Sequence, residues 1–325
     1  MTNRLALSRR TSALLGAALV AGVSALPATA QYQQIFAFSD AFPGAGDGNL
    51  SGVAVVGGDL IATNAFSNAG TNSVAEGPPF STLVNNTDLV LAGADTLGLD
   101  PGQFYAISPT SALVADRRTD SIFTINTANS TVSQVATKAD IQTFTGGTNV
   151  GISDPTLDTN GNIVFYDSSS DGIVSSSSTG TLSSIATDAN LTAGIGNDTT
   201  NGLAANPNSE VLYFGDDGND EIYSLDYSGV TNVYNTVLTN AEIALVTGDT
   251  ALQVDNMLFG GDGLIYFYDG RTDSIYSFDP TDAANTLTTV INESDLLAGP
   301  GGADIIGGLT WVDGQIAWTV LRSSS

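Results

Sequence analysis

The sequence predicts an all-β fold, a six-bladed β-propeller whose ring is closed by the N-terminal strand. Three observations lead to this prediction: a repeat of about fifty residues, short apolar runs broken by Gly, Asn and Asp, and a last repeat that stops before its later strands. Short apolar runs separated by turn residues are typical of all-β proteins. Four-stranded units of this kind bury their faces when they stack radially.

Residues 1–30 have the pattern of an export signal, so the propeller is expected to span residues 31–325. Three arginines form a basic start, an apolar run follows, and "PATA" offers a small-residue cleavage site after Ala30. The pattern leaves open whether the general or the twin-arginine route is used. We therefore expect a secreted or periplasmic protein that does not insert into a membrane.

The composition excludes several kinds of chemistry. The chain has no Cys and no His, which rules out disulfides, thiolate nucleophiles and histidine bases. Once the signal is removed, five basic residues remain against 34 acidic ones, a net charge of −29. Such a surface repels nucleic acid. We expect the partner to be a protein, a glycan or a small molecule.

Four segments carry the clearest copies of the repeat. Each has an apolar run, an Asp, three further residues, a second Asp and a run that contains Ile. The segments are "ALVADRRTDSIFTIN" (112–126), "NIVFYDSSSDGIVSSS" (162–177), "VLYFGDDGNDEIYSLD" (211–226) and "LIYFYDGRTDSIYSFD" (264–279). The first Asp recurs at spacings of 51, 49 and 53 residues. The pairs predict turn caps, because Asp side chains bond to nearby backbone N–H groups.

Each unit is expected to contain four strands. In the fourth unit we place them at 202–206, 210–215, 221–226 and 230–238. The first strands of the six units are expected to begin near residues 51, 104, 153, 202, 255 and 307. The sixth unit lacks its later strands, and residues 34–40 resemble one of them, so the N-terminal strand is expected to pair into the sixth blade. This pairing would leave no exposed sheet edge.

A second signal recurs in phase with the strands. Thr or Asn followed three residues later by Asp, Asn or Glu predicts the capped start of a short helix. The segments are "NNTDLV" (85–90), "TKADIQ" (137–142), "TDANLT" (187–192), "TNAEIA" (239–244) and "NESDLL" (292–297). We expect helices of at most two turns that decorate the connections between units.

Polar residues mark the starts of the first strands. In a propeller these positions converge on the central channel, and carboxylate and amide oxygens are the ligands that calcium prefers. The candidate metal ligands are Asn49, Ser153, Asp154, Asn201 and Asp255. The alternative is that these residues are ordinary polar residues at strand starts, without a bound ion.

Three segments resemble the gluconolactonase and paraoxonase-like six-bladed propellers. "NGLAANPNSEVLYFGDD" (201–217) resembles a family segment whose Asn binds the central calcium, which implies that role for Asn201. "VDNMLFGGDGLIYF" (254–267) is similar to the following segment, which implies that Asp255 is both a ligand and the catalytic base. "SDPTLDTNGNIVF" (153–165) looks like an earlier segment, with Ser153 in the place of an Asn and Asp154 beside it.

The resemblance has gaps, and it leaves two functions open. The N-terminal Glu ligand of the family has no match, because "GNLSGV" (48–53) offers only Asn49. The hairpin pattern is equally similar to NHL and TolB-type repeats, which mostly bind partners. We favour an exported binding or scaffold module, with or without a calcium ion in the channel. The alternative is a calcium-dependent lactone or ester hydrolase, in which the metal activates water and Asp255 accepts the proton.

Overall fold

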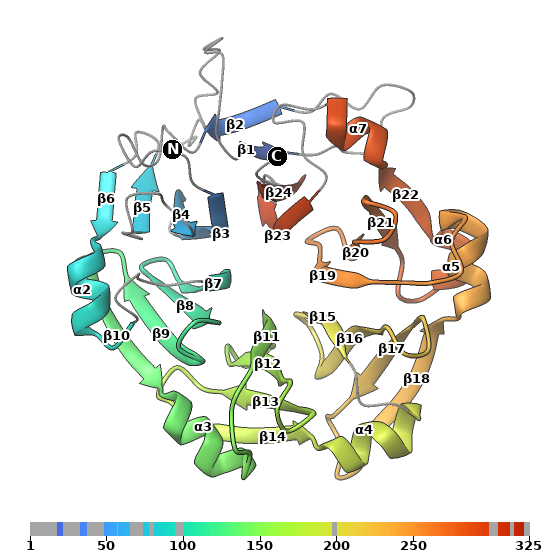
Figure 1. The fold of residues 1–325 in the computed structure, drawn as a ribbon, viewed down its shortest axis with the longest axis horizontal. Coiled ribbons are helices and arrows are strands. Elements are labelled where there is room, and N and C mark those ends of the chain that lie inside the picture. The colour runs from blue at the N-terminus through green and yellow to red at the C-terminus, as the bar shows by residue number, and fades with distance from the viewer. Residues whose placement is uncertain are drawn as a thin grey trace.

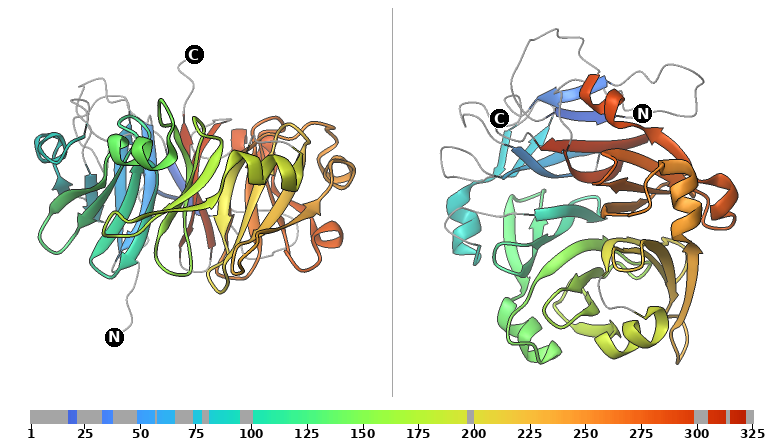
Figure 2. Two further views of the ribbon diagram at one scale, coloured as in Figure 1. Left: turned by 90° about the horizontal axis from the view of Figure 1, so that it is seen from below. Right: turned by 45° about the vertical axis from the view of Figure 1, so that its right-hand side comes forward.

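The strands of this protein are arranged radially around a central axis (Figure 1), and from the side the molecule is a flat disc (Figure 2). The computed structural model describes residues 18–21, 33–37, 49–56, 58–65, 74–77, 81–94, 101–196, 200–298, 305–312 and 315–321. The arrangement confirms the predicted all-β class and the β-propeller fold. No helix within these ranges is long and apolar enough to cross a membrane.

The described strands form six four-stranded antiparallel sheets, which we number along the chain. Sheet 1 contains β3 (Asn49–Val56), β4 (Asp59–Ala65), β5 (Val74–Gly77) and β6 (Ser81–Val84). Sheet 2 contains β7 (Pro101–Ser108), β8 (Ser111–Asp116), β9 (Ser121–Asn126) and β10 (Thr131–Ala136). Sheet 3 contains β11 (Ile152–Leu157), β12 (Ile163–Asp167), β13 (Gly172–Ser176) and β14 (Leu182–Ala186).

The next two sheets repeat this up-and-down order. Sheet 4 contains β15 (Asn201–Ala205), β16 (Val211–Asp216), β17 (Glu221–Asp226) and β18 (Val233–Leu238). Sheet 5 contains β19 (Val254–Phe259), β20 (Ile265–Asp269), β21 (Ser274–Phe278) and β22 (Thr288–Ile291). The first strands of neighbouring sheets contact one another in chain order, and β23, the first strand of sheet 6, contacts both β19 and β3.

Sheet 6 combines the two ends of the chain. It contains β23 (Ile305–Val312), β24 (Gln315–Leu321), β1 (Ala18–Ala21) and β2 (Gln33–Ala37), in that order. The expected N-terminal strand therefore lies in this sheet as β2, but its direct neighbour is β1, which belongs to the expected signal segment. Leu19 of β1 lies opposite Thr319 of β24 and opposite Phe36 of β2. The rest of residues 1–30 lies outside the described residues.

Short helices decorate the connections, as predicted. The helices that follow the fourth strands are α2 (Asn86–Leu91), α3 (Lys138–Thr145), α4 (Asp188–Ile195), α5 (Asn240–Thr247) and α7 (Glu293–Ala298). Capping boxes open α3, α4 and α5 at Thr137, Thr187 and Thr239. A further short helix, α6 (Ala283–Thr286), lies between β21 and β22. Figure 1 shows the helices at the periphery of the disc.

The paired aspartates cap the hairpins between the second and third strands, which confirms the predicted turns. The first Asp of each pair accepts a hydrogen bond from the backbone N–H two residues further on, at 2.8–3.3 Å. The second Asp adopts a left-handed backbone, with φ between 46° and 56°. The four pairs are Asp116/Asp120, Asp167/Asp171, Asp216/Asp220 and Asp269/Asp273. Asp tolerates this conformation better than most residues do.

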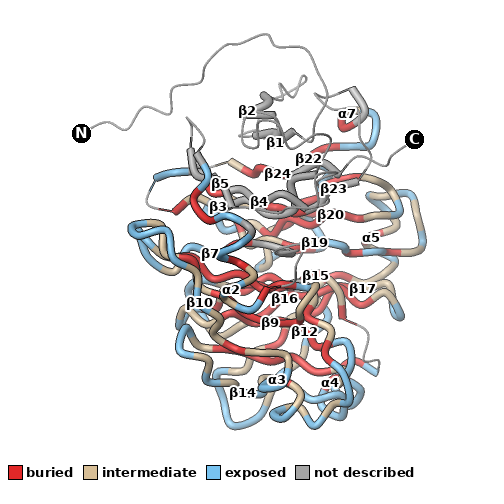
Figure 3. Tube along the Cα trace, turned by 60° about the vertical axis from the view of Figure 1, so that its left-hand side comes forward, coloured by how far each residue is buried: buried red, intermediate tan, exposed pale blue. Residues whose placement is uncertain are grey.

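The hydrophobic core is divided among the spaces between sheets (Figure 3). Each cluster of buried residues draws on two neighbouring sheets, as where Ile61 of sheet 1 and Phe123 of sheet 2 share one cluster. The aromatic run of β20 serves both of its neighbours: Phe267 packs in the cluster with sheet 4, while Tyr266 and Tyr268 pack in the cluster with sheet 6. This alternation follows the two-residue period of a strand.

Candidate functional site

The structure places all five predicted site residues at the starts of first strands. Asn49 begins β3, Asn201 begins β15, and Asp255 is the second residue of β19. Ser153 and Asp154 are the second and third residues of β11. Figure 1 shows these strands around the centre of the disc. The side chains of Asn49 and Asp154 lie outside the described residues.

Asn201 is bonded to an acidic residue that the sequence analysis did not single out. Its Nδ2–H donates to Oδ2 of Asp217 at 2.6 Å, which links β15 to the β16–β17 hairpin of the same sheet. The pKa of Asp217 is raised to about 6, chiefly by burial and also by the negative charge of Asp255, and the bond from Asn201 partly offsets this rise. The raised value indicates a carboxyl group that changes its protonation near neutral pH.

Asp255 lies near enough for its charge to act on Asp217, and it is bonded to Gln253, the residue that precedes β19. Gln253 Nε2 donates to both carboxylate oxygens of Asp255, at 3.0 and 3.3 Å. Partial burial of the carboxyl group raises the pKa of Asp255, and the charges of Asp269 and Asp273 act in the same direction. We call Asn201, Asp217 and Asp255 the axial cluster.

Ser153 is bonded within its own sheet instead. Its hydroxyl donates to the backbone carbonyl of Tyr166 at 3.4 Å. None of the described contacts joins it to the axial cluster. Of the predicted residues with described side chains, the structure therefore brings Asn201 and Asp255 together, through Asp217, and leaves Ser153 apart.

Calcium is the ion that the resemblance implies, and the described side chains do not provide a suitable set of oxygen ligands for it. Within the described ranges, no group of three or more His, Cys, Asp or Glu side chains is placed to hold a metal ion. The amide of Asn201 directs its N–H towards Asp217, whereas calcium requires oxygen ligands. The axial cluster is therefore a pair of partly buried carboxyl groups and an amide donor, and it supplies too few oxygen ligands for calcium.

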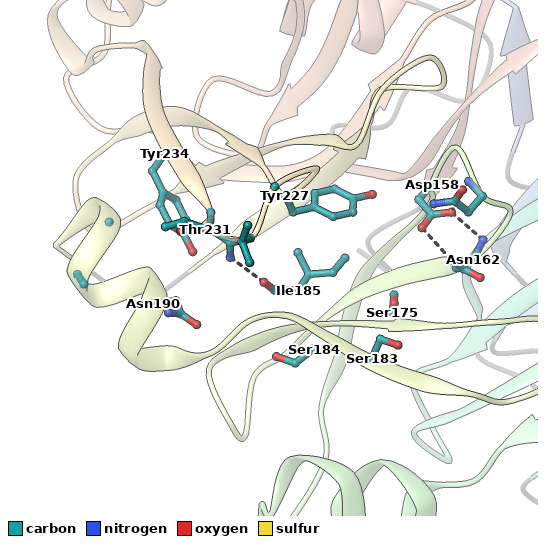
Figure 4. A pocket seen from close by; sticks show the side chains of 16 residues that line it. Asp158, Asn162, Ser175, Ser183, Ser184, Ile185, Asn190, Tyr227, Thr231 and Tyr234 are labelled. Atoms are coloured by element: carbon teal, nitrogen blue, oxygen red, sulfur yellow. Dashed lines mark hydrogen bonds between the residues drawn. The ribbon is translucent and has the colours of Figure 1, made fainter.

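A separate pocket opens between sheets 3 and 4 (Figure 4). Its volume is about 780 Å³, within the roughly 300–1,000 Å³ typical of ligand pockets. Its walls come from β13, β14, α4, the β11–β12 hairpin and the β17–β18 hairpin. Hydroxyl and amide side chains predominate, including Ser183, Ser184, Asn190 and Asn232. We call this space the inter-sheet pocket.

Two tyrosines form one wall of the inter-sheet pocket. Tyr227 directly follows β17 and Tyr234 lies in β18, and Figure 4 shows Ser183 and Ser184 on the opposite side from Tyr227. Both tyrosine hydroxyl oxygens are buried; that of Tyr227 has no hydrogen-bond partner among the described residues, whereas Asn232 interacts with the hydroxyl of Tyr234 and lowers its pKa. Burial raises the pKa of each tyrosine, and the charges of Asp158 and Glu210 add to the effect at Tyr227. Both hydroxyls are therefore neutral at physiological pH.

Hydrogen bonds between the two sheets hold the pocket open. The backbone N–H of Ala205 donates to Thr156 Oγ1 at 3.1 Å, and Asn232 Nδ2 donates to the carbonyl of Ile185 at 2.7 Å. Tyr234 packs directly on Gly194 of α4, where a Cβ atom would lie 2.4 Å from its ring. These contacts place the walls before any ligand arrives, which reduces the entropic cost of binding.

Sequence reasoning missed the inter-sheet pocket because its walls come from two consecutive units. The one signal for it is that Tyr227 and Tyr234 flank the polar loop "SGVTNV" (228–233), which no other unit repeats. Asp217 was missed because it sits in "DDGNDE" (216–221), which was interpreted as a turn. That interpretation holds for Asp216 and Asp220, and Asp217 between them faces Asn201.

Comparisons with known proteins support the fold. No protein-family model matches the sequence, and a search of curated proteins finds no match. A chain of a nidogen/laminin complex superposes with a TM-score of 0.56 at 15% identity, covering 86% of this chain and 95% of that chain.

Two further solved structures are similar at low identity. A gluconolactonase from Xanthomonas campestris gives a TM-score of 0.53 at 13% identity, with 86% of this chain and 87% of that chain covered. Regucalcin, a calcium-binding protein from Agrobacterium tumefaciens, gives 0.53 at 11% identity, with 84% and 89% covered. The chain thus has a β-propeller fold, and its resemblance to the gluconolactonase-type propellers holds at the level of that fold.

Proposed function

We propose that this chain is an exported binding module that binds a small polar ligand in the inter-sheet pocket. The observation that carries the proposal is the buried hydroxyl of Tyr227, a residue that lines the pocket, which has no hydrogen-bond partner among the described residues. A buried hydroxyl that makes no hydrogen bond is costly, and a ligand that bonds to it removes that cost. The pocket is also large enough for a small ligand, and hydrogen bonds between sheets 3 and 4 fix the position of its walls.

The proposal includes the architecture around the pocket. We propose a six-bladed ring that the N-terminal strands close, because β1 pairs with β24 and β23 contacts β3. The basic and apolar pattern of residues 1–30 supports export to the periplasm or the exterior. After cleavage behind Ala30, β1 leaves with the signal, and β2 is then the segment available to pair with β24.

Soaking crystals in a mixture of small probes tests the binding function. The mixture contains a neutral polyol, a carboxylate, an amine and an aromatic alcohol. We expect electron density for at least one probe in the inter-sheet pocket, within hydrogen-bond distance of the Tyr227 or Tyr234 hydroxyl. A pocket that stays free of every probe, while probes bind elsewhere on the molecule, would overturn the proposal.

A second candidate function is hydrolysis of a lactone or an ester at the axial cluster. The observation that favours it is the pKa of about 6 for Asp217 next to Asp255, because such a carboxyl group exchanges protons near neutral pH. In this scheme Asp255 accepts the proton from water. The described side chains of the axial cluster supply too few oxygen ligands for the calcium ion that this mechanism needs. Ligand binding in the inter-sheet pocket is therefore the better supported function. Turnover of a lactone or aryl ester that Asp255→Ala abolishes would reverse this order.

A further inference from the structure

We infer that the ligand of the inter-sheet pocket is a neutral, polyhydroxylated molecule, a short oligosaccharide. The inference rests on the proposed function of this pocket as a binding site, and it adds the chemical class of the ligand. Three properties of the lining carry it: its charge, its hydrogen-bonding groups and its aromatic wall.

The lining disfavours charged ligands. Its sixteen residues, all within the described ranges, include no Lys or Arg and a single carboxylate, Asp158. That carboxylate is already occupied, because it accepts bonds from the backbone N–H groups of Asn160 and Asn162, both at 2.8 Å, and from Asn162 Nδ2 at 3.0 Å. The net charge of −26 on the whole chain further repels anions. A neutral ligand needs no charged partner in the lining and is not repelled by the negative charge of the chain.

The hydrogen-bonding groups suit a ligand covered with hydroxyls. Serine, threonine and tyrosine hydroxyls both donate and accept, and asparagine amides offer one group of each kind. Such groups line both walls, with Ser183, Ser184 and Asn190 on the side of sheet 3 and Tyr227 and Thr231 on the side of sheet 4. A sugar presents hydroxyls around its whole rim, so it can bond to both walls at once.

The aromatic wall supplies the apolar contact that the C–H face of a sugar ring requires. Tyr227 and Tyr234 on the side of sheet 4 and Ile185 on the side of sheet 3 bring apolar surface to a mostly polar pocket (Figure 4). Aromatic rings carry a negative face that attracts the slightly positive C–H groups of a ligand. The volume of about 780 Å³ exceeds the needs of one sugar ring and accommodates a short oligosaccharide.

The test is a titration of the chain with neutral oligosaccharides and with charged counterparts. The neutral probes are tetramers of glucose with β-1,4 or α-1,4 linkage, of xylose and of N-acetylglucosamine. The counterparts are a galacturonic acid trimer, a glucosamine trimer and p-cresol. Calorimetry gives the dissociation constant, and the NMR shifts of the Asn232 side-chain amide and the Gly194 backbone amide report on the pocket.

We expect at least one neutral tetramer to bind and to shift both signals. Tyr227→Phe and Tyr234→Phe should each weaken that binding about fivefold, because each removes one hydrogen bond to the ligand. Tyr227→Phe should leave the melting temperature unchanged, since the Tyr227 hydroxyl has no hydrogen-bond partner among the described residues. The control Tyr268→Phe removes a hydroxyl that donates to Asp273 in sheet 5; it should lower the melting temperature and leave sugar binding unchanged.

The remaining outcomes separate the two claims. If only a charged probe or p-cresol shifts the pocket signals, the sugar inference fails and the binding function stands. If no probe shifts them, both fail. Sugar binding that neither tyrosine substitution weakens would place the sugar elsewhere on the molecule and overturn the inference.

Discussion

Asn201 and Asp217 are joined by a hydrogen bond of 2.6 Å that ties the first strand of sheet 4 to its central hairpin. The two residues are sixteen positions apart in the sequence and meet because β15 and β16 pair antiparallel. The bond places a carboxyl group in a partly buried position beside Asp255, whose negative charge opposes the ionisation of Asp217. Ionisation of Asp217 in this position therefore destabilises the folded state.

Asp217→Asn should stabilise the protein at neutral pH. The pKa of Asp217 is about 6 in the folded state, against 3.8 without the fold. The folded state therefore binds more protons between these values, and stability falls as the pH rises from about 4 to about 6. The asparagine keeps an oxygen acceptor for Asn201 and cannot ionise, so we expect a gain of about 1 kcal/mol at pH 7 and none below pH 4.

Urea denaturation between pH 4 and pH 8 measures this effect. The control is Asp226→Asn, because hydrogen bonds from Ser228 lower the pKa of Asp226 and its substitution should bring no gain at neutral pH. If the stability curves of wild type and Asp217→Asn run parallel over this range, Asp217 is not the group that titrates.

Asp220→Ala should loosen the contact between sheets 4 and 5. Asp220 Oδ1 accepts the backbone N–H of Leu252 at 2.8 Å, and Oδ2 accepts Asn240 Nδ2 at 3.2 Å. The substitution removes the acceptor of the backbone N–H of the buried Leu252 and places alanine at φ 56°. We expect a loss of about 2–3 kcal/mol in the free energy of unfolding.

Asp220→Asn is the matched variant for this position. Asparagine keeps an acceptor for Leu252 and tolerates the left-handed backbone, so its cost should stay below about 1 kcal/mol. Chemical denaturation of both variants gives their free energies of unfolding for comparison. Equal losses would mean that the inter-sheet bond contributes nothing.

Removal of the N-terminal strand should destabilise sheet 6. In the chain that starts at residue 31, β1 is absent and β2 (Gln33–Ala37) is the segment available to pair with β24. We expect hydrogen exchange to show protected β24 amides in this chain and unprotected ones in a chain that starts at residue 39, because unpaired strand edges exchange with water. A chain from residue 39 that melts as cooperatively, and at the same temperature, would contradict closure by the N-terminal strand.

Calcium should leave the melting temperature unchanged. After chelation, calorimetry with about 1 mM calcium, a concentration that saturates many extracellular calcium modules, should give the same midpoint for the wild type and for Asp255→Ala. The described donors of the axial cluster supply too few oxygens for this ion. An increase that Asp255→Ala abolishes would instead support the hydrolase, and a panel of lactones and aryl esters would follow.

The fold could be predicted because each unit carries its own local signals. The Asp pairs set the hairpins, the Thr-led boxes start the helices, and the apolar runs mark the strands; the first strands begin within three residues of the expected positions. These signals are contained in a few neighbouring residues, so one sequence suffices to find them. The place of β1 in sheet 6 was not predicted, since its apolar residues have the pattern of an export signal.

The functional surface was harder to predict because it arises between units. Tyr227 and Ile185 meet at the inter-sheet pocket although they are far apart in the sequence, and no periodic pattern links them. The axial cluster was found in part: the starts of the first strands marked Asn201 and Asp255, whereas Asp217 depends on the register of β15 against β16.

Filling the inter-sheet pocket with a bulky side chain tests whether this pocket is the binding site. Ala193 lines the pocket from an exposed position on α4, so Ala193→Trp should occupy the space without disturbing the core. Thr143→Trp introduces the same side chain at the corresponding exposed position of α3, which does not line the pocket. The measurement is calorimetric titration of both variants with the neutral tetramer that binds the wild type best. We expect Ala193→Trp to abolish binding and Thr143→Trp to retain it; equal binding by the two variants would show that the sugar binds outside the inter-sheet pocket.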